Sequence, residues 1–234
     1  MKNEHLYHAL HLVNGIEENT PICRYTELDY LLQMLEEETY RISRKETFED
    51  KCEGSFPTNR VIPVSAVGKH LPPQPMQNTD ECLRIWRSIQ RNRYVPTACW
   101  THNMSDRLSM WKMFTSKYGV CIKSNVHDVA ASFKINDYDI WCGKITYDGY
   151  YAQKGFIANM FSKRSVFSEE TECRFYLFEC NETDIQTPFI KVPIMPKTMI
   201  SEIVLSPLIA HTTAKLLAEM LQVTYKIKTT ISNI

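Results

Sequence analysis

Two glutamates that are one residue apart, Glu170 and Glu172, precede an apolar segment in the stretch KRSVFSEETECRFYLF at 163–178. Paired carboxylates can act as general acids and bases or stabilise positive charge that develops in a reaction. Residues two apart in an extended segment point to the same side, so both carboxylates could serve one substrate. Arg174 lies two residues further along the same face, so a local Glu172–Arg174 ion pair is the structural alternative.

Arg24 lies inside the apolar segment ICRY at 22–25, and a planar guanidinium at such a place suits phosphate or ribose recognition. Trp100, in the apolar stretch TACW, could stack on a base at the edge of a cleft. Trp111 is spaced with Leu108 and Phe114 as on a helix, so it is first of all a core aromatic residue and only second a ligand contact.

Two basic groups are further candidates. The doublet Lys163 and Arg164 is ordinarily solvated but could contact phosphates. Arg84, Arg87 and Arg91 fall on one face of the helix expected in ECLRIWRSIQRNRY. They form either a solvated helix face or a contact for nucleic-acid phosphates or an acidic protein partner.

The net charge is zero, because 27 Lys and Arg balance 27 Asp and Glu, so the overall composition does not favour binding to nucleic acid or membranes. The eight cysteines contain no CxxC pair, and Cys99 with His102 lacks the second pair of a zinc site, so we expect no metal. The N-terminal stretch is not a secretory signal, and no stretch approaches the about 20 apolar residues of a membrane span. A cytoplasmic location is therefore expected.

Short strand and helix signals alternate without a regular βαβ rhythm, and no GxGxxG or GxxxxGK[ST] motif occurs, which favours an α+β fold. We expect a single domain over 1–234 with a Pro-rich excursion at 54–79. Strands are expected near 22–25, 39–43, 95–101, 118–124, 139–147, 172–180, 189–194, 200–206 and 223–231, and helices near 26–40, 81–94, 105–117, 125–133, 152–164 and 206–222.

Four segments, taken in order, carry a resemblance: CRYTEL at 23–28, the TACWTHNMSDRLSMWKMFTSKYGVCIKS block at 97–124, FSKRSVFSEETECR at 161–174 and ISEIVLSP at 200–207. They resemble the motifs of a large bacterial family called domain of unknown function twenty-nine seventy-one. The match spans nearly the whole chain. That family is similar in layout to ADP-ribosyltransferases, which bind NAD in a cleft between two small sheets with flanking helices.

The resemblance implies roles for particular residues. Glu172 is implied to hold the NAD ribose as positive charge develops on it, and Glu170 to assist the acceptor nucleophile. The implied NAD contacts are Arg24, Tyr25, Trp100, Thr101, Trp111, Lys163 and Arg164. NAD is implied as co-substrate, with no metal.

The implied function is an NAD-dependent ADP-ribosyltransferase, acting as a toxin or phage-defence effector and restrained by an antitoxin protein. The arginine face favours RNA slightly over protein as the macromolecular acceptor. Three alternatives stay open: an NAD glycohydrolase, in which water replaces the acceptor; a non-catalytic nucleotide-sensing or protein-interaction module; and a structural domain in which these motifs only pack.

Overall fold

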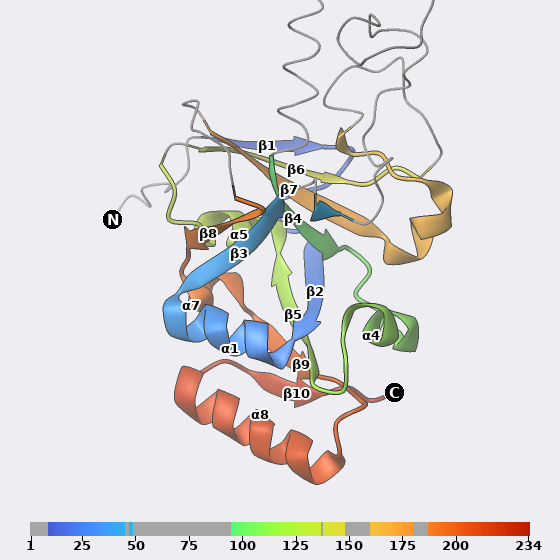
Figure 1. The fold of residues 1–234 in the computed structure, drawn as a ribbon, viewed down its shortest axis with the longest axis vertical. Coiled ribbons are helices and arrows are strands. Elements are labelled where there is room, and N and C mark those ends of the chain that lie inside the picture. Colours follow the sequence, from blue (N-terminus) through green and yellow to red (C-terminus); the bar gives the residue numbers. More distant parts are fainter. Residues whose placement is uncertain (1–8, 45–46, 49–94, 137, 148–159, 180–186) are drawn as a thin grey trace, which may run out of the picture.

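A computed structural model describes residues 9–44, 47–48, 95–136, 138–147, 160–179 and 187–234 (Figure 1). The strands are β1 (Ala9–Val13), β2 (Pro21–Glu27), β3 (Thr39–Arg44), β4 (Pro96–Thr101), β5 (Gly119–Asn125), β6 (Tyr138–Lys144), β7 (Glu172–Glu179), β8 (Phe189–Pro193), β9 (Glu202–Leu205) and β10 (Thr229–Ile231). The helices are α1 (Leu28–Glu37), α4 (Leu108–Phe114), α5 (Val126–Ser132), α7 (Pro196–Met199), α8 (His211–Tyr225) and the short 3-10 helix η2 (Ser165–Glu170).

The described strands form one mixed sheet in the order β1-β6-β7-β4-β2-β5-β9-β10, while β3 pairs with β4 and with β8. The outer pairs β1–β6 and β9–β10 are parallel, and the strands between them are antiparallel. Helices and strands mixed in this way confirm the predicted α+β class. The expected two small sheets are present only as two halves of one sheet, joined at a single point between β2 and β4.

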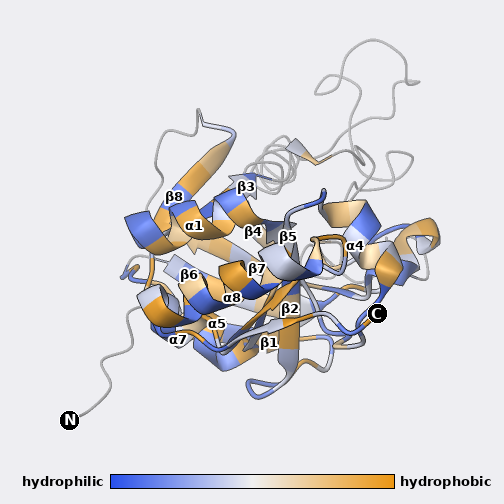
Figure 2. Ribbon diagram, turned by 90° about the horizontal axis from the view of Figure 1, so that it is seen from below, coloured by the Kyte–Doolittle hydropathy of each residue, from blue (hydrophilic) through white to orange (hydrophobic). Residues whose placement is uncertain are grey.

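Successive side chains of β2 and β5 lie on opposite faces of the sheet, so the apolar residues of these strands are divided between the two faces. Ile22 and Ile122 belong to the main core, which α1, α5, α7 and α8 share, whereas Cys23 and Cys121 pack against α4 on the other face. The period of two along a strand is the cause of this division. Figure 2 shows that α1 also carries both hydrophobic and hydrophilic residues along its length.

Helix α1 forms where the sequence predicts it, because Leu28, Leu31 and Leu35 recur at helical spacing and are buried. Full burial of a leucine side chain such as Leu31 stabilises the fold by about 1.5–3 kcal/mol. The helix then ends at Glu38, which adopts the left-handed conformation (φ 47°). Among the described residues, no helix is long and apolar enough to cross a membrane.

Two expectations near the chain ends were wrong. The helix predicted at 206–222 lies at His211–Tyr225, so the strand predicted at 223–231 is reduced to Thr229–Ile231. The helix continues through Val223 and Thr224 because packing of its Ala214 and Leu221 outweighs β-branched propensity. Strand β1 was not predicted; it pairs in parallel with β6, and His11 stacks on Trp141 with ring centroids 4.4 Å apart.

Candidate active site

Strands β2 and β4 are neighbours in the sheet, but their backbones pair at one position only, Cys23 opposite Thr101. In contrast, β2 pairs with β5 at seven positions, from Pro21 to Glu27. The other end of β4 pairs with β3, where Thr97 lies opposite Ser43. Between these two points no described strand pairs with this edge of β4, and a cavity of about 240 Å³ opens there.

This cavity is called the β2–β4 cleft. Its walls come from β2, β3, β4, α4 and the start of β7, which are distant in sequence but adjacent in the sheet. The lining residues are Cys23, Arg24, Tyr25, Ser43, Phe48, Thr97, Cys99, Trp100, Thr101, Met110, Phe114, Glu170 and Glu172. Six of the residues that the sequence analysis singled out are therefore brought together: Arg24, Tyr25, Trp100, Thr101, Glu170 and Glu172.

Strand register explains why the start of β7 reaches the cleft. Thr101 lies opposite Cys23 on one side and opposite Glu172 on the other. Directly opposed residues of antiparallel strands share a face of the sheet. The side chain of Glu172 is therefore on the same face as those of Cys23 and Thr101, although 149 positions separate Cys23 from Glu172.

The two glutamates lie in a compact network with two cations. Arg174 donates from Nε to Oε1 and from Nη2 to Oε2 of Glu172, both at 2.6 Å. Lys163 Nζ lies 2.6 Å from Oε2 of Glu170 and 3.2 Å from Oε2 of Glu172, so it bridges the two carboxylates. The side chain of Arg174 has no exposed surface and that of Glu172 is 5% exposed. The local Glu172–Arg174 ion pair, which the sequence analysis named as the structural alternative to a catalytic role, is thus formed.

The surroundings move the pKa values of the two carboxyl groups in opposite directions. Burial by itself would raise the pKa of Glu172, but the charge and hydrogen bonds of Arg174, together with Lys163, lower it to about 2. Burial raises the pKa of Glu170 above its ordinary value, and Lys163 only partly opposes this, while the negative charge of Glu172 adds to it. At neutral pH Glu172 is firmly ionised, whereas Glu170 is the carboxyl group closer to taking up a proton.

The backbone between the two glutamates is not the extended segment that the sequence suggested. Glu170 ends helix η2, and Thr171 adopts the left-handed conformation (φ 43°), which a β-branched residue rarely does. Thr101 Oγ1 and Thr171 Oγ1 are 2.8 Å apart, and Arg107 Nη2 donates to Thr171 Oγ1 at 3.2 Å. These contacts hold a strained turn, and the carboxylates converge on Lys163 through that turn rather than through strand alternation.

Arg24 lies at the point where β2 and β4 separate. Its Nη1 donates to the backbone oxygen of Cys99 at 3.1 Å, and its guanidinium carbon lies 5.2 Å from the centre of the Tyr40 ring. The hydrogen bond ties the guanidinium to the open edge of β4. Arg24 is also the one residue of the predicted set that lines both this cleft and a second cavity beside α1.

Lys163 and Arg164, the two predicted phosphate contacts, lie in surroundings that differ from each other. The charge of Lys163 is engaged by Glu170 and Glu172, and its side chain is 9% exposed. Arg164 is exposed, lies 5.3 Å from the ring centre of Phe167 and is not among the residues that line the cleft. Lys163 therefore acts on the acidic pair, because its ammonium faces carboxylates rather than the cavity.

Tyr25 and Trp111 are in edge contact, with ring centroids 4.8 Å apart, but only Tyr25 reaches the cleft. Trp111 has no exposed surface, and its Nε1 donates to Asp106 Oδ1 at 2.7 Å. Trp111 therefore lies behind Tyr25 and is not among the residues that line the cleft. The sequence pointed to this, since the helical spacing of Trp111 is that of a core residue.

Several other predictions fall elsewhere. Arg84, Arg87, Arg91 and the Pro-rich excursion lie outside the described residues. The cleft residues Ser43 and Thr97 were not predicted, because only the register of their strands brings them to the cleft. Tyr40, which lines the second cavity, was not predicted either, because no local sequence pattern indicates its burial. Within the described part of the chain, no group of three or more His, Cys, Asp or Glu side chains could hold a metal ion.

Comparisons with known proteins give weak likenesses. No protein-family model matches the sequence, and no curated protein matches it. Structures of DarT from Thermus sp. 2.9 match at 10% identity: one with ADP-ribosylated ssDNA (TM-score 0.39, 93% of this chain and 96% of that chain), and one with carba-NAD+ (TM-score 0.40, 92% and 96%). A third holds NAD+ (TM-score 0.37, 93% and 98%). TM-scores this low do not establish a shared fold, so the functional argument rests on the residues of the cleft.

Proposed function

We propose that this protein transfers ADP-ribose from NAD to a macromolecule in the β2–β4 cleft. The observation that carries the proposal is the convergence upon one cavity of Arg24 from β2, Thr101 from β4 and the Glu170–Glu172 pair from the junction of η2 and β7. These are the positions that the family resemblance implies, and they are far apart in sequence. A purely structural role for each residue would not require that they share a cavity.

Glu172 is suited to stabilise the transition state of glycosyl transfer. As the bond between nicotinamide N1 and ribose C1′ breaks, nicotinamide leaves with the electron pair and positive charge develops on the ribose. A carboxylate with a pKa of about 2 stays ionised at neutral pH and can accept a hydrogen bond from a ribose hydroxyl. The bond strengthens as the charge grows, which is how binding lowers a barrier.

A carboxylate has about four lone-pair sites. Arg174 and Lys163 donate three hydrogen bonds to Glu172. The thiol of Cys99 is a further donor to this carboxylate and the weakest of them. A ribose hydroxyl would take the place of that thiol without disturbing the buried pair with Arg174.

Glu170 is the group placed to receive the acceptor's proton. The lone pair of the acceptor nucleophile forms the new bond to C1′, and its proton passes to the Glu170 carboxylate and then to water. A raised pKa makes a carboxylate a better base near neutral pH. Water in place of the acceptor would give an NAD glycohydrolase by the same steps.

The proposal also includes an acceptor molecule and a biological role. RNA remains the acceptor that the arginine stripe at 84, 87 and 91 favours, with protein as the other class. A toxin or phage-defence role restrained by an antitoxin follows from the proposed chemistry, since uncontrolled transfer to RNA or protein would damage the cell that makes the enzyme. Growth arrest on expression, abolished by Arg24→Gln, is the expected result of a simple test of that role.

The biochemical test uses NAD labelled in its adenylate phosphate, incubated with the protein and with total RNA, lysate protein or single-stranded DNA in separate tubes. We expect label in RNA, release of free nicotinamide, and loss of both with Glu170→Gln and with Arg24→Gln. Glu219→Gln is the matched control, because Glu219 is exposed on α8 and lies outside the cleft. Each variant is first compared with the wild type by circular dichroism.

The outcomes separate the alternatives. Label in protein or DNA redirects the acceptor but keeps the transferase, and nicotinamide release without labelled product indicates the glycohydrolase. If the folded wild type releases no nicotinamide under any of these conditions, the catalytic proposal is wrong and a non-catalytic module is the better interpretation.

A further inference from the structure

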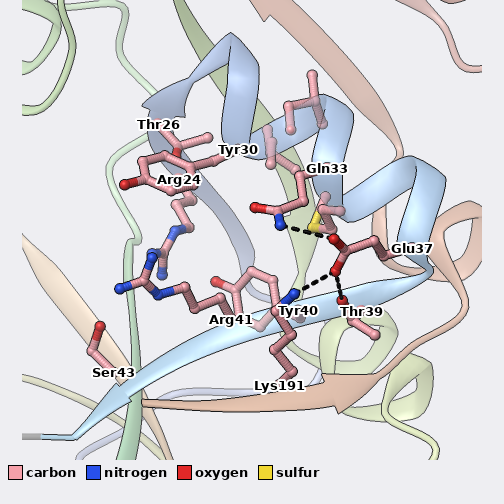
Figure 3. Close-up of a pocket in the computed structure, with 13 residues that line it drawn as sticks. Arg24, Thr26, Tyr30, Gln33, Glu37, Thr39, Tyr40, Arg41, Ser43 and Lys191 are labelled. Atoms are coloured by element: carbon pink, nitrogen blue, oxygen red, sulfur yellow. Dashed lines mark hydrogen bonds and ion pairs between the residues drawn. The ribbon is translucent and has the colours of Figure 1, made fainter. Parts of the chain in front are cut away.

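A second cavity, of about 250 Å³, lies between α1, β2, β3 and β8 (Figure 3). It is called the α1 pocket, and the side chains used in the argument are Arg24, Tyr30, Glu37, Tyr40, Arg41 and Lys191. The α1 pocket and the β2–β4 cleft share Arg24 and Ser43 among their lining residues. The two cavities are therefore adjacent, on either side of the place where β2 leaves β4.

The α1 pocket carries an excess of positive charge. Three cationic side chains against one carboxylate, Glu37, leave a net charge of +2 among its lining residues. Lys191 Nζ lies 2.7 Å from Oε2 of Glu37, so these two charges compensate each other. Arg24 and Arg41 form no ion pair within the part of the chain that the structure describes; Arg24 is hydrogen-bonded to a backbone carbonyl. Two uncompensated guanidinium groups in one cavity favour an anion between them.

The contacts of Arg41 leave its donors available. Its guanidinium carbon lies 4.0 Å from the ring centre of Phe189 and 5.9 Å from that of Tyr30. Such contacts occupy the flat faces of a guanidinium, whereas its five N–H donors lie in the plane. Figure 3 shows the guanidinium groups of Arg24 and Arg41 at the same end of the pocket. Paired in-plane donors are the geometry that binds phosphate oxygens in a bidentate manner.

A buried hydroxyl group supplies a second, independent observation. Tyr40 is 4% exposed; burial raises the pKa of its hydroxyl, the neighbouring Arg24 guanidinium opposes this rise, and Oη has no partner within strict hydrogen-bond geometry among the described residues. In Figure 3 this hydroxyl points toward the end of the pocket where the arginines lie. A buried hydroxyl without a partner is unfavourable, and a ligand oxygen at this place would remove the penalty. At the mouth, the ring of Tyr30 is 52% exposed and offers a surface on which a base can stack.

We propose that the α1 pocket binds the diphosphate of a nucleoside diphosphate, with Arg41 and Arg24 as phosphate ligands and Tyr40 as a hydroxyl donor. Such a group occurs in free ADP and in the ADP half of NAD. The inference rests on the proposed function only for the choice between these two sources, because the charge and the buried hydroxyl belong to the pocket itself. If NAD is the source, the dinucleotide passes Arg24 and extends from the cleft into the pocket.

The test is isothermal titration calorimetry with ADP, adenosine, inorganic pyrophosphate and NAD as probes. We expect ADP and pyrophosphate to bind the wild type, and adenosine to bind far more weakly. Arg41→Gln should weaken ADP binding on the order of 10- to 100-fold, since a charge-assisted contact to phosphate is lost. Arg41 is exposed on β3, so this substitution leaves the core intact. Lys215→Gln, exposed on α8 outside the pocket, is the control and should bind ADP as the wild type does.

Comparison of the probes then assigns the source. Binding of NAD that weakens with Arg41→Gln, together with a higher KM for NAD at little changed kcat, indicates the dinucleotide. Binding of ADP without NAD indicates a free nucleotide. The inference is overturned if the wild type does not bind ADP, or if Arg41→Gln binds it as tightly as the wild type. If the wild type consumes no NAD but ADP binding still depends on Arg41, the proposed transferase function is wrong and the nucleotide site in the α1 pocket is still supported.

Discussion

The buried pair of Glu172 and Arg174 predicts that Glu172→Gln alters folding as well as activity. The substitution removes the negative charge opposite a guanidinium that has no exposed surface. Arg174 would lose both of its hydrogen bonds to the carboxylate and would keep the hydroxyl of Tyr176, 3.3 Å from Nη1. Removal of one side of a buried ion pair typically destabilises a protein by about 3–5 kcal/mol.

The pKa of Glu172 gives a second route to the magnitude. It lies at about 2 in the folded protein, against an ordinary value of 4.5. At about 1.4 kcal/mol for each pKa unit, the ionised form of Glu172 contributes about 3 kcal/mol to the free energy of unfolding. The two routes agree within their precision, and the loss is a large fraction of the about 5–15 kcal/mol that stabilises an ordinary domain.

The assay is urea unfolding followed by circular dichroism at pH 7 for the wild type, Glu172→Gln, Arg174→Met and the double variant. Each single variant should lose about 3 kcal/mol of unfolding free energy, because each removes one side of the buried Glu172–Arg174 pair. The double variant should lose clearly less than the sum of the two, since Met fills most of the volume of Arg174 and neither charge of the pair is left without the other. It is then the better protein for the activity assay.

The pH dependence of stability follows from the same pair. Because the pKa of Glu172 is lower in the folded protein than in the unfolded chain, its contribution is complete above about pH 4.5 and is lost as the pH falls toward about 2. Glu170, whose pKa is raised, contributes in the opposite sense: its stabilisation is present at low pH and is lost as the pH rises. Glu172→Gln also removes the negative charge that helps to raise the pKa of Glu170, so part of the Glu170 contribution is lost with it. Equal unfolding free energies for these two proteins at pH 7 would refute the reasoning.

Three further predictions concern the cleft and its support. The wild type should show an acidic limb in the pH profile of kcat, set by a pKa above the ordinary value of a glutamate, and Glu170→Gln should be inactive over the whole range, both measured by nicotinamide release from pH 4 to 8. Trp111→Phe should lower the free energy of unfolding by about 1 kcal/mol in urea titration, because the hydrogen bond to Asp106 is lost. Gly143→Ala should be destabilised by about 1–3 kcal/mol in the same titration, since the added Cβ would lie 2.4 Å from Cγ2 of Val13.

The elements of the fold were largely predictable because their patterns are local. Leu28, Leu31 and Leu35 recur at helical spacing, and the run ECRFYLF at the start of β7 is apolar enough to mark a buried strand. Strand β1 escaped prediction, because its five residues are half-buried at the edge of the sheet and carry a histidine that stacks on Trp141. Edge strands have weaker patterns, since packing on only one side leaves fewer positions constrained.

The cleft itself could not be predicted from local patterns, because it depends on which strands meet and where they part. The single pair between Cys23 and Thr101, and the position of Thr101 opposite Glu172, are matters of register over more than a hundred residues. The left-handed turn at Thr171 is likewise imposed by Thr101 and Arg107. Residue types and the family resemblance gave six of the cleft residues, and the tertiary structure supplies the others and their mutual placement.

The sequence analysis treated the Glu172–Arg174 ion pair as an alternative to a catalytic role of Glu172, but the pair is compatible with catalysis. A carboxylate that must stabilise positive charge has to remain ionised in a buried place, where desolvation alone would protonate it. Arg174 and Lys163 prevent this and set the pKa of Glu172 at about 2. The negative charge they maintain in turn helps to raise the pKa of Glu170. When the pKa values of two neighbouring carboxyl groups are moved apart, one group can serve as a fixed charge and the other as a base. Here Glu172 is the fixed charge and Glu170 is the base. A pair that only stabilised the fold would need Arg174, but it would not need Lys163 shared between two glutamates at the wall of a cavity.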